Sequence, residues 1–194
     1  MKNLSTNSIK REYYDYNTKS KTQNITAYAK IIGGVKASYR SDIVGIIEVT
    51  KRTGPAAVVA LKDSLKTATE TWDYMVTPVL TYQTGNLGEN NAMIYKTTIN
   101  GKAVVKTIPQ NFPSVGFRNR VPVLFQIGYG TKTGNTVSLE GKIQMITWHA
   151  PAPKDIVPVK EIDGLSKGIA QMIQASKIDP NAPLLIAGDF NFDT

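Results

Sequence analysis

Short runs of apolar residues, many of them β-branched, recur along the chain and predict a series of strands. The run Ile43–Ile47 is continuous rather than alternating, which is typical of a strand that is buried on both faces. By similar criteria we expect strands at residues 74–79, 92–98, 103–108, 121–127 and 137–148, a weaker one at 4–9, and a last one over 184–191.

Three segments place apolar residues at helical spacing and predict helices. The first lies between Ile25 and Val35, and the second runs from Pro55, whose fixed φ suits a first helical turn, to Leu65. The third presents one apolar face, which we expect to lie in the core and which is formed by Ile162, Leu165, Ile169, Met172 and Ile173.

Helices that fall between strands, with hairpins in the middle of the chain, predict an α/β fold. Asn100-Gly101 between two strand-forming runs is a strong signal for a two-residue hairpin turn. We expect a four-layer α/β sandwich in which two packed mixed sheets are flanked by helices. The length of 194 residues, without an internal repeat or a linker, predicts a single domain over residues 1–194.

Composition excludes several kinds of site and leaves the compartment open. The chain has no cysteine, so a disulfide framework, a thiolate nucleophile and a cysteine-ligated metal are excluded. No apolar run approaches the ~20 residues that cross a bilayer, and no membrane partner is expected. The N-terminus shows no signal peptide, which fits either a cytoplasmic or a processed secreted protein. The net charge of +8 favours a polyanionic partner such as DNA or another nucleic acid.

Polar residues at the ends of the apolar strands are the candidates for chemistry. They are Asn7, Glu48, Glu89, His149 and the pair Asp189 and Asn191. Strand ends hold side chains firmly, and this mixture of carboxylates, amides and one imidazole suits a divalent cation and a phosphodiester. Each residue alone also has a structural explanation: Glu48 as a strand exit, His149 as a half-buried imidazole, and Asp189 in an Asx-turn.

The order of these residues along the chain resembles the endonuclease/exonuclease/phosphatase superfamily. Its deoxyribonuclease I-like members, including the nuclease subunit of cytolethal distending toxin, are the most similar. Ile47 stands where the family usually has a glutamine. The resemblance is carried by the segments 4–9, 41–49, 89–96, 120–125, 148–153 with 161–165, and 188–191.

The resemblance implies a role for each candidate residue. Glu48, Asn7 and Asp189 would bind Mg²⁺, with Mn²⁺ or Ca²⁺ as other possible ions. His149, oriented by Glu89, would be catalytic together with Asp189 and Asn191. The phosphate of the substrate would be bound by Asn7, Arg120 and Asn191.

The function that this resemblance implies is a metal-dependent phosphodiester hydrolase, and a DNA endonuclease of low sequence specificity is the favoured form. A catalytically incomplete relative that binds nucleic acid or protein is one alternative. A phosphoinositide phosphatase or a lipid phosphodiesterase is another.

Family members continue after Gly-Asp-x-Asn with a second aspartate and a second histidine, which the printed sequence lacks. We therefore expect a C-terminally truncated domain with an incomplete second sheet, and activity of the 194-residue chain alone stays open. We expect self-association or a second chain to complete the open sheet edge.

Overall fold

The protein is seen in a computed structural model that describes most of the chain from residue 41 onward. The described residues are Ala29, Ile32, 41–51, 54–77, 82–84, 87–113, 117, 120–150 and 158–190. The predicted strand at 4–9 lies outside them. So does the predicted helix at 25–35, except for Ala29 and Ile32, which are both helical. No helix in the described part is long and apolar enough to cross a bilayer.

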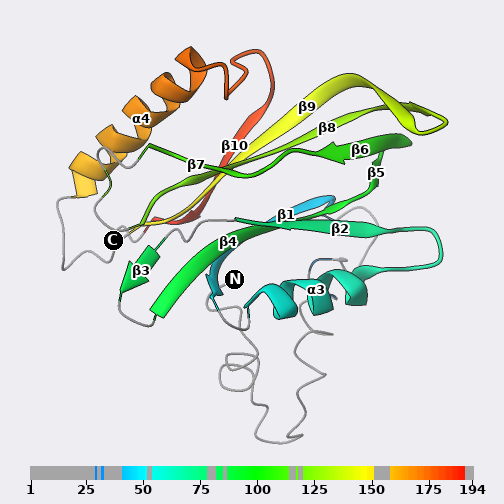
Figure 1. Ribbon diagram of the computed structural model, residues 1–194, viewed down its shortest axis with the longest axis horizontal. Coiled ribbons are helices and arrows are strands. Elements are labelled where there is room, and N and C mark those ends of the chain that lie inside the picture. Colours follow the sequence, from blue (N-terminus) through cyan, green and yellow to red (C-terminus); the bar gives the residue numbers. More distant parts are fainter. Residues whose placement is uncertain are drawn as a thin grey trace, which may run out of the picture.

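One layer of the fold is a four-stranded antiparallel sheet, the lower sheet in Figure 1. Its central strand is β4 (Leu87–Lys96), which pairs with the other three. These are β1 (Ile43–Thr50), β2 (Trp72–Val76) and β3 (Tyr82–Thr84).

The facing layer is a six-stranded sheet in which β9 (Thr136–His149) pairs with β8 (Val123–Thr133) on one side and β10 (Leu184–Asp189) on the other. The β9–β10 pairing is parallel and the others are antiparallel, so this sheet is mixed as expected, whereas the described strands of the first are all antiparallel. Beyond β8 lie β5 (Thr98–Ile99), β6 (Lys102–Lys106) and β7 (Gln110–Asn111).

The predicted hairpin at Asn100-Gly101 is confirmed. It joins β5 to β6, and φ is 49° at Asn100 and 75° at Gly101, as a type I′ turn requires. Glycine and asparagine reach these positive φ values at the lowest cost, so the sequence determines this turn locally.

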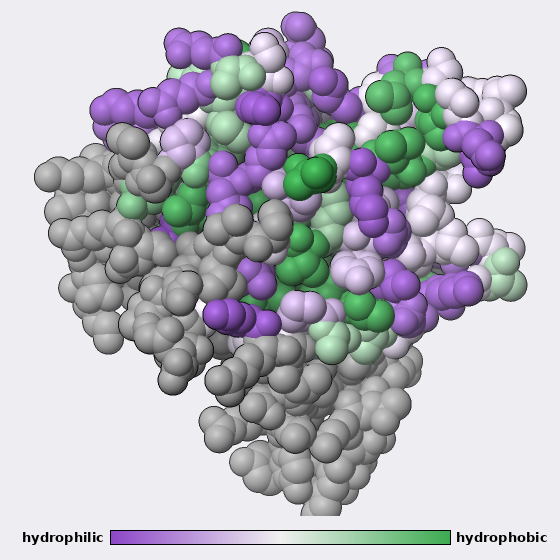
Figure 2. All heavy atoms as spheres, viewed as in Figure 1, coloured by the Kyte–Doolittle hydropathy of each residue, from purple (hydrophilic) through white to green (hydrophobic). Residues whose placement is uncertain are grey.

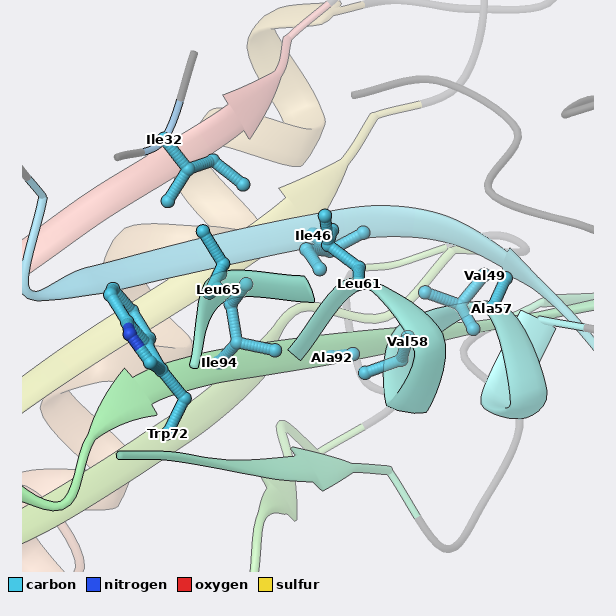
Figure 3. Packing of buried hydrophobic residues seen from close by; sticks show 10 residues of the cluster. All are labelled: Ile32, Ile46, Val49, Ala57, Val58, Leu61, Leu65, Trp72, Ala92 and Ile94. Carbon is cyan, nitrogen blue, oxygen red and sulfur yellow. The ribbon is translucent and has the colours of Figure 1, made fainter. Parts of the chain in front are cut away.

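Helices cover the outer face of each sheet, which confirms the predicted four-layer arrangement (Figure 1). The helix α3 (Gly54–Leu65) packs on the first sheet, and α4 (Pro158–Gln174) lies over the second. Figure 3 shows the α3 layer, in which Leu61 lies beside Ile46 and Leu65 lies beside Ile94. A third apolar cluster lies between the sheets and includes Met75, Met93, Tyr95, Val123, Phe125, Ile127 and Met145.

β1 is buried on both faces, as its continuous apolar run predicted. Ile46 and Val49 point toward α3 and are fully buried. Gly45 faces the other sheet so closely that an added Cβ would lie 2.9 Å from Met145 Sδ and from Thr147 Cγ2. The strand therefore fills the space between a helix and a sheet.

The predicted apolar face of α4 is only partly correct. Leu165 and Met172 are buried, but Ile162 is 44% exposed and Ile173 is 37% exposed. Among the described residues, the surface that covers α4 is narrower than the apolar stripe of the helix. Hydrophilic residues gather on the outer side of α4 (Figure 2).

β10 lies at the edge of the described part of its sheet. Leu185 is 48% exposed and Ile186 is 44% exposed. Adjacent side chains point to opposite faces of a strand, so both faces of β10 are open among the described residues. Cover of this edge by another molecule stays a prediction, as does the single domain over residues 1–194.

Candidate active site

Glu48 owes its position to a β-bulge in β1. Between the pairs Ile46↔Ala92 and Val49↔Asn90, β1 has one residue more than β4. Glu48 lies in this bulge with a φ of 56°, a left-handed conformation that costs a residue with a Cβ about 1–2 kcal/mol. Its side chain is only 6% exposed and lies against the end of β9.

His149, the last residue of β9, lies between two carboxylates of the facing sheet. Its Nδ1 is 3.2 Å from Oε2 of Glu89, and its Nε2 is 3.0 Å from Oε1 of Glu48. Glu89 is the third residue of β4 and pairs with Thr50 of β1. The imidazole, whose side chain is 10% exposed, therefore joins the two sheets at one end of the sandwich.

Arg120 joins this group from the segment before β8. One guanidinium nitrogen, Nη1, is 2.9 Å from Nε2 of His149 and donates to the carbonyl of Ala150 at 3.2 Å, while Nη2 is 3.5 Å from Oε1 of Glu89. The indole Nε1 of Trp148 donates to the carbonyl of Arg120 at 3.0 Å. Since Trp148 is buried in the cluster beneath α4, it anchors the arginine backbone to a rigid part of the fold.

Asp189 comes from the neighbouring strand. The parallel register of β9 and β10 pairs it with His149, and the amide of Ala150 donates to its carbonyl at 2.8 Å. Glu48, His149 and Asp189 each offer a ligand atom, and these atoms lie within 4.8 Å of one another. Three strands from two sheets thus meet at one point.

The contacts around His149 cannot all be satisfied by one protonation state. Because Nη1 of Arg120 is a donor, Nε2 of His149 accepts and Nδ1–H donates to Glu89. In that tautomer no hydrogen lies between Nε2 and Glu48 Oε1, although they are 3.0 Å apart. A proton on Nε2 could be donated to Glu48, but it would then face the N–H of Arg120 Nη1, and two donors cannot form a hydrogen bond with each other.

A divalent cation suits the ligand atoms of this site. Carboxylate oxygens from Glu48 and Asp189 come together beside the imidazole of His149. The ligands of an octahedral Mg²⁺ are roughly 3–4 Å apart, so Glu48 and Asp189 need only a small closure. Mn²⁺ and Ca²⁺ also accept carboxylates.

Five of the seven expected site residues come together where β9 and β10 end and β4 begins, on the left of Figure 1. They are Glu48, Glu89, Arg120, His149 and Asp189. The other two, Asn7 and Asn191, lie outside the described residues.

Two buried polar residues beside the site were missed in the sequence. Asn91 of β4 is 2% exposed and Thr147 of β9 is 1% exposed, and their side chains form a hydrogen bond between the sheets. The available signal was a pair of asparagines, Asn90-Asn91, directly before an apolar run that predicts a buried strand.

Comparison with known proteins identifies the fold. No protein-family model and no curated protein matches the sequence. Among solved structures, truncated TDP2 from Caenorhabditis elegans is similar, with a TM-score of 0.51 and 13% identity over 89% of this chain and 56% of that chain. This similarity shows that the chain shares the fold of that structure.

The shared fold agrees with the α/β sandwich that the sequence predicted. An endonuclease/exonuclease/phosphatase family protein from Leptotrichia buccalis C-1013-b has a TM-score of 0.49 and 16% identity, over 93% of this chain and 63% of that chain. The chain thus spans less than two thirds of the length of either protein.

Proposed function

We propose that this chain carries the active site of a metal-dependent phosphodiester hydrolase, and that its substrate is DNA, cleaved with low sequence specificity. The observation that supports the proposal is the continuous arrangement of Glu89, His149 and Glu48, with Asp189 beside them, at one end of the sandwich. One buried and two half-buried carboxylates around one imidazole favour proton transfer and cation binding over a purely structural role.

In this proposal Glu48 and Asp189 hold the divalent cation, which when bound stabilises the charge that develops on the phosphate. Glu89 accepts the Nδ1–H bond of His149, which fixes the tautomer and leaves Nε2 to exchange a proton with a reacting oxygen. Arg120 presents two guanidinium nitrogens at the same place, and we propose that they bind a phosphate oxygen pair.

Asn7 and Asn191 complete the proposed site. Asn191 follows Asp189 by two residues, and we propose that its amide binds phosphate or the attacking water. Asn7 is proposed as a further contact to the cation and the phosphate.

The net charge of +8 supports a polyanionic substrate, because phosphates that are neutralised by lysine and arginine release counterions. This term is independent of sequence, which agrees with low specificity. It favours a nucleic acid over a small phosphoester.

Nicking of a supercoiled plasmid in Mg²⁺ and in EDTA tests the proposal. Glu48→Gln and His149→Ala are expected to abolish nicking. Glu140→Gln is the matched control. Glu140 lies on β9, the strand that ends at His149, but roughly 30 Å from that residue, and its carboxylate binds Lys102. Cleavage that persists in EDTA, or in both site variants, would contradict the proposal.

Other outcomes would separate the alternatives. Retention of DNA in a gel-shift assay without nicking would favour the binding relative. Faster hydrolysis of a phosphoinositide or a lipid phosphodiester than of DNA would keep the hydrolase and change its substrate.

A further inference from the structure

The inner faces of the two sheets change from apolar to polar toward the active site. On β4, Met93 lies in the apolar core, Asn91 follows, and Glu89 reaches the site, all on one face because side chains alternate along a strand. On β9 the same progression runs from Met145 through Thr147 to His149. Asn91 and Thr147 therefore form the layer between the dry core and the site.

This layer is one compact hydrogen-bonded contact between the sheets. Nδ2 of Asn91 donates to Oγ1 of Thr147 at 2.8 Å and to the Thr147 carbonyl at 3.2 Å. The backbone of Asn91 is held by Thr77, whose Oγ1 accepts from the Asn91 amide at 3.2 Å and whose own amide donates to the Asn91 carbonyl at 3.0 Å.

Asn91 is also the residue that stands against the β1 bulge. The extra residue of β1 lies between the partners of Asn90 and Ala92, so Ile47 and Glu48 together oppose Asn91. The buried amide of Asn91 is thus close to all three site residues. It lies two residues from Glu89 on β4 and opposite Glu48 on the neighbouring strand, and it bonds Thr147, which is two residues from His149 on the facing sheet.

We propose that Asn91 is a positioning residue of the active site and that it acts through Thr147. The inference rests on the proposed function. Apolar contacts are not directional, so a sheet pair held by them alone can slide by fractions of an ångström. Two hydrogen bonds from one amide fix the separation and the register of β4 and β9 at the point where Glu89 and His149 must meet.

The single histidine of the chain gives a direct readout of this positioning. In protein that carries no histidine tag, the imidazole ¹⁵N signals at fixed pH belong to His149 alone and report its tautomer. We expect wild-type protein to show mainly Nδ1–H, and Asn91→Leu and Thr147→Val to show a mixture of tautomers. Thr147→Ser keeps the hydroxyl and is expected to retain the wild-type signal.

Gln144→Leu is the matched control. Gln144 is fully buried on β9, three residues before Thr147 and therefore on the opposite face, and it exchanges hydrogen bonds of 2.8 and 2.9 Å with the backbone of Asp179. Its loss should lower the free energy of unfolding and leave the imidazole signal and the cleavage rate unchanged.

Cleavage kinetics are the second readout. In Mg²⁺, Thr147→Val and Asn91→Leu are expected to lower kcat, by up to about 100-fold, with little change in KM, and Thr147→Ser should restore the rate. If the wild-type chain does not cleave, the proposed function fails, and the imidazole signal alone decides the inference. An unchanged tautomer in Asn91→Leu and Thr147→Val, in protein that remains folded by circular dichroism, would overturn it.

Discussion

Nδ1 of His149 lies 3.2 Å from Oε2 of Glu89, a carboxylate that is 60 positions away along the chain. The two residues belong to different sheets, so their distance depends on how the sheets pack. Glu48 and Asp189 arrive at the same point from two further strands. The chemistry of the site is therefore sensitive to packing between the sheets.

Replacing Glu89 with glutamine should slow catalysis without unfolding the protein. Glu89→Gln keeps an acceptor for Nδ1–H but removes the charge that supports the imidazole and Arg120. We expect kcat to fall by about 10- to 100-fold with little change in KM. Plasmid nicking under single-turnover conditions measures this, with Glu140→Gln as the control. Equal rates for the two variants would remove Glu89 from the mechanism.

Two substitutions of Glu48 should separate backbone strain from function. A φ of 56° strains alanine but not glycine. The free energy of unfolding of Glu48→Gly should therefore exceed that of Glu48→Ala by about 1 kcal/mol. Both variants lack the carboxylate and should be equally inactive. Urea unfolding measures the difference. Ala60→Gly in α3 is the control, because there the same exchange of alanine for glycine should lower the free energy of unfolding, by roughly 0.5–1 kcal/mol.

Gly45→Ala tests the close approach of the two sheets. The added Cβ would lie 2.9 Å from Met145 Sδ and from Thr147 Cγ2, which predicts a loss of about 1–3 kcal/mol in the free energy of unfolding. Thr147→Ser removes Cγ2, so Gly45→Ala should cost less in that background. Costs that simply add in the double mutant would contradict this.

The carboxyl group of Asp73 should contribute to stability only above acidic pH. Burial raises its pKa, but hydrogen bonds from Lys106 at 2.9 Å, from the Tyr74 amide at 2.8 Å and from Tyr95 at 3.0 Å outweigh burial and hold the pKa below its ordinary value. In acid the unfolded chain therefore binds more protons at this carboxyl than the folded chain does. The contribution of Asp73 to the free energy of unfolding is complete above about pH 5 and is lost as the pH falls below about 4.

Urea unfolding of wild type and Asp73→Asn at pH 3 and pH 7 measures this contribution. We expect the variant to be less stable than wild type at pH 7 by at most about 1 kcal/mol, because the side chain is 36% exposed, and to approach wild type at pH 3. A difference that is the same at both pH values would contradict the prediction.

Local signals predicted most of the elements, and they failed where packing decides. The hairpin at Asn100-Gly101 depends on φ preferences of two residues, β1 on a continuous apolar run and α3 on apolar periodicity, so each could be predicted from the sequence. Ile162 and Ile173 look like core residues by the same periodicity, but exposure depends on what lies above a helix, and periodicity does not contain that information.

The sequence by itself determined most of the described elements, the absence of cysteine chemistry and, through its motifs, the candidates Glu48, Glu89, Arg120, His149 and Asp189. Only the tertiary structure decided that these side chains meet, that a bulge at φ 56° presents Glu48, and that Asn91 bonds Thr147 beneath them. The physical reason is range: turn and helix signals act within a few residues, whereas the site is assembled by strands from two sheets whose spacing is set by side chains far apart in the chain.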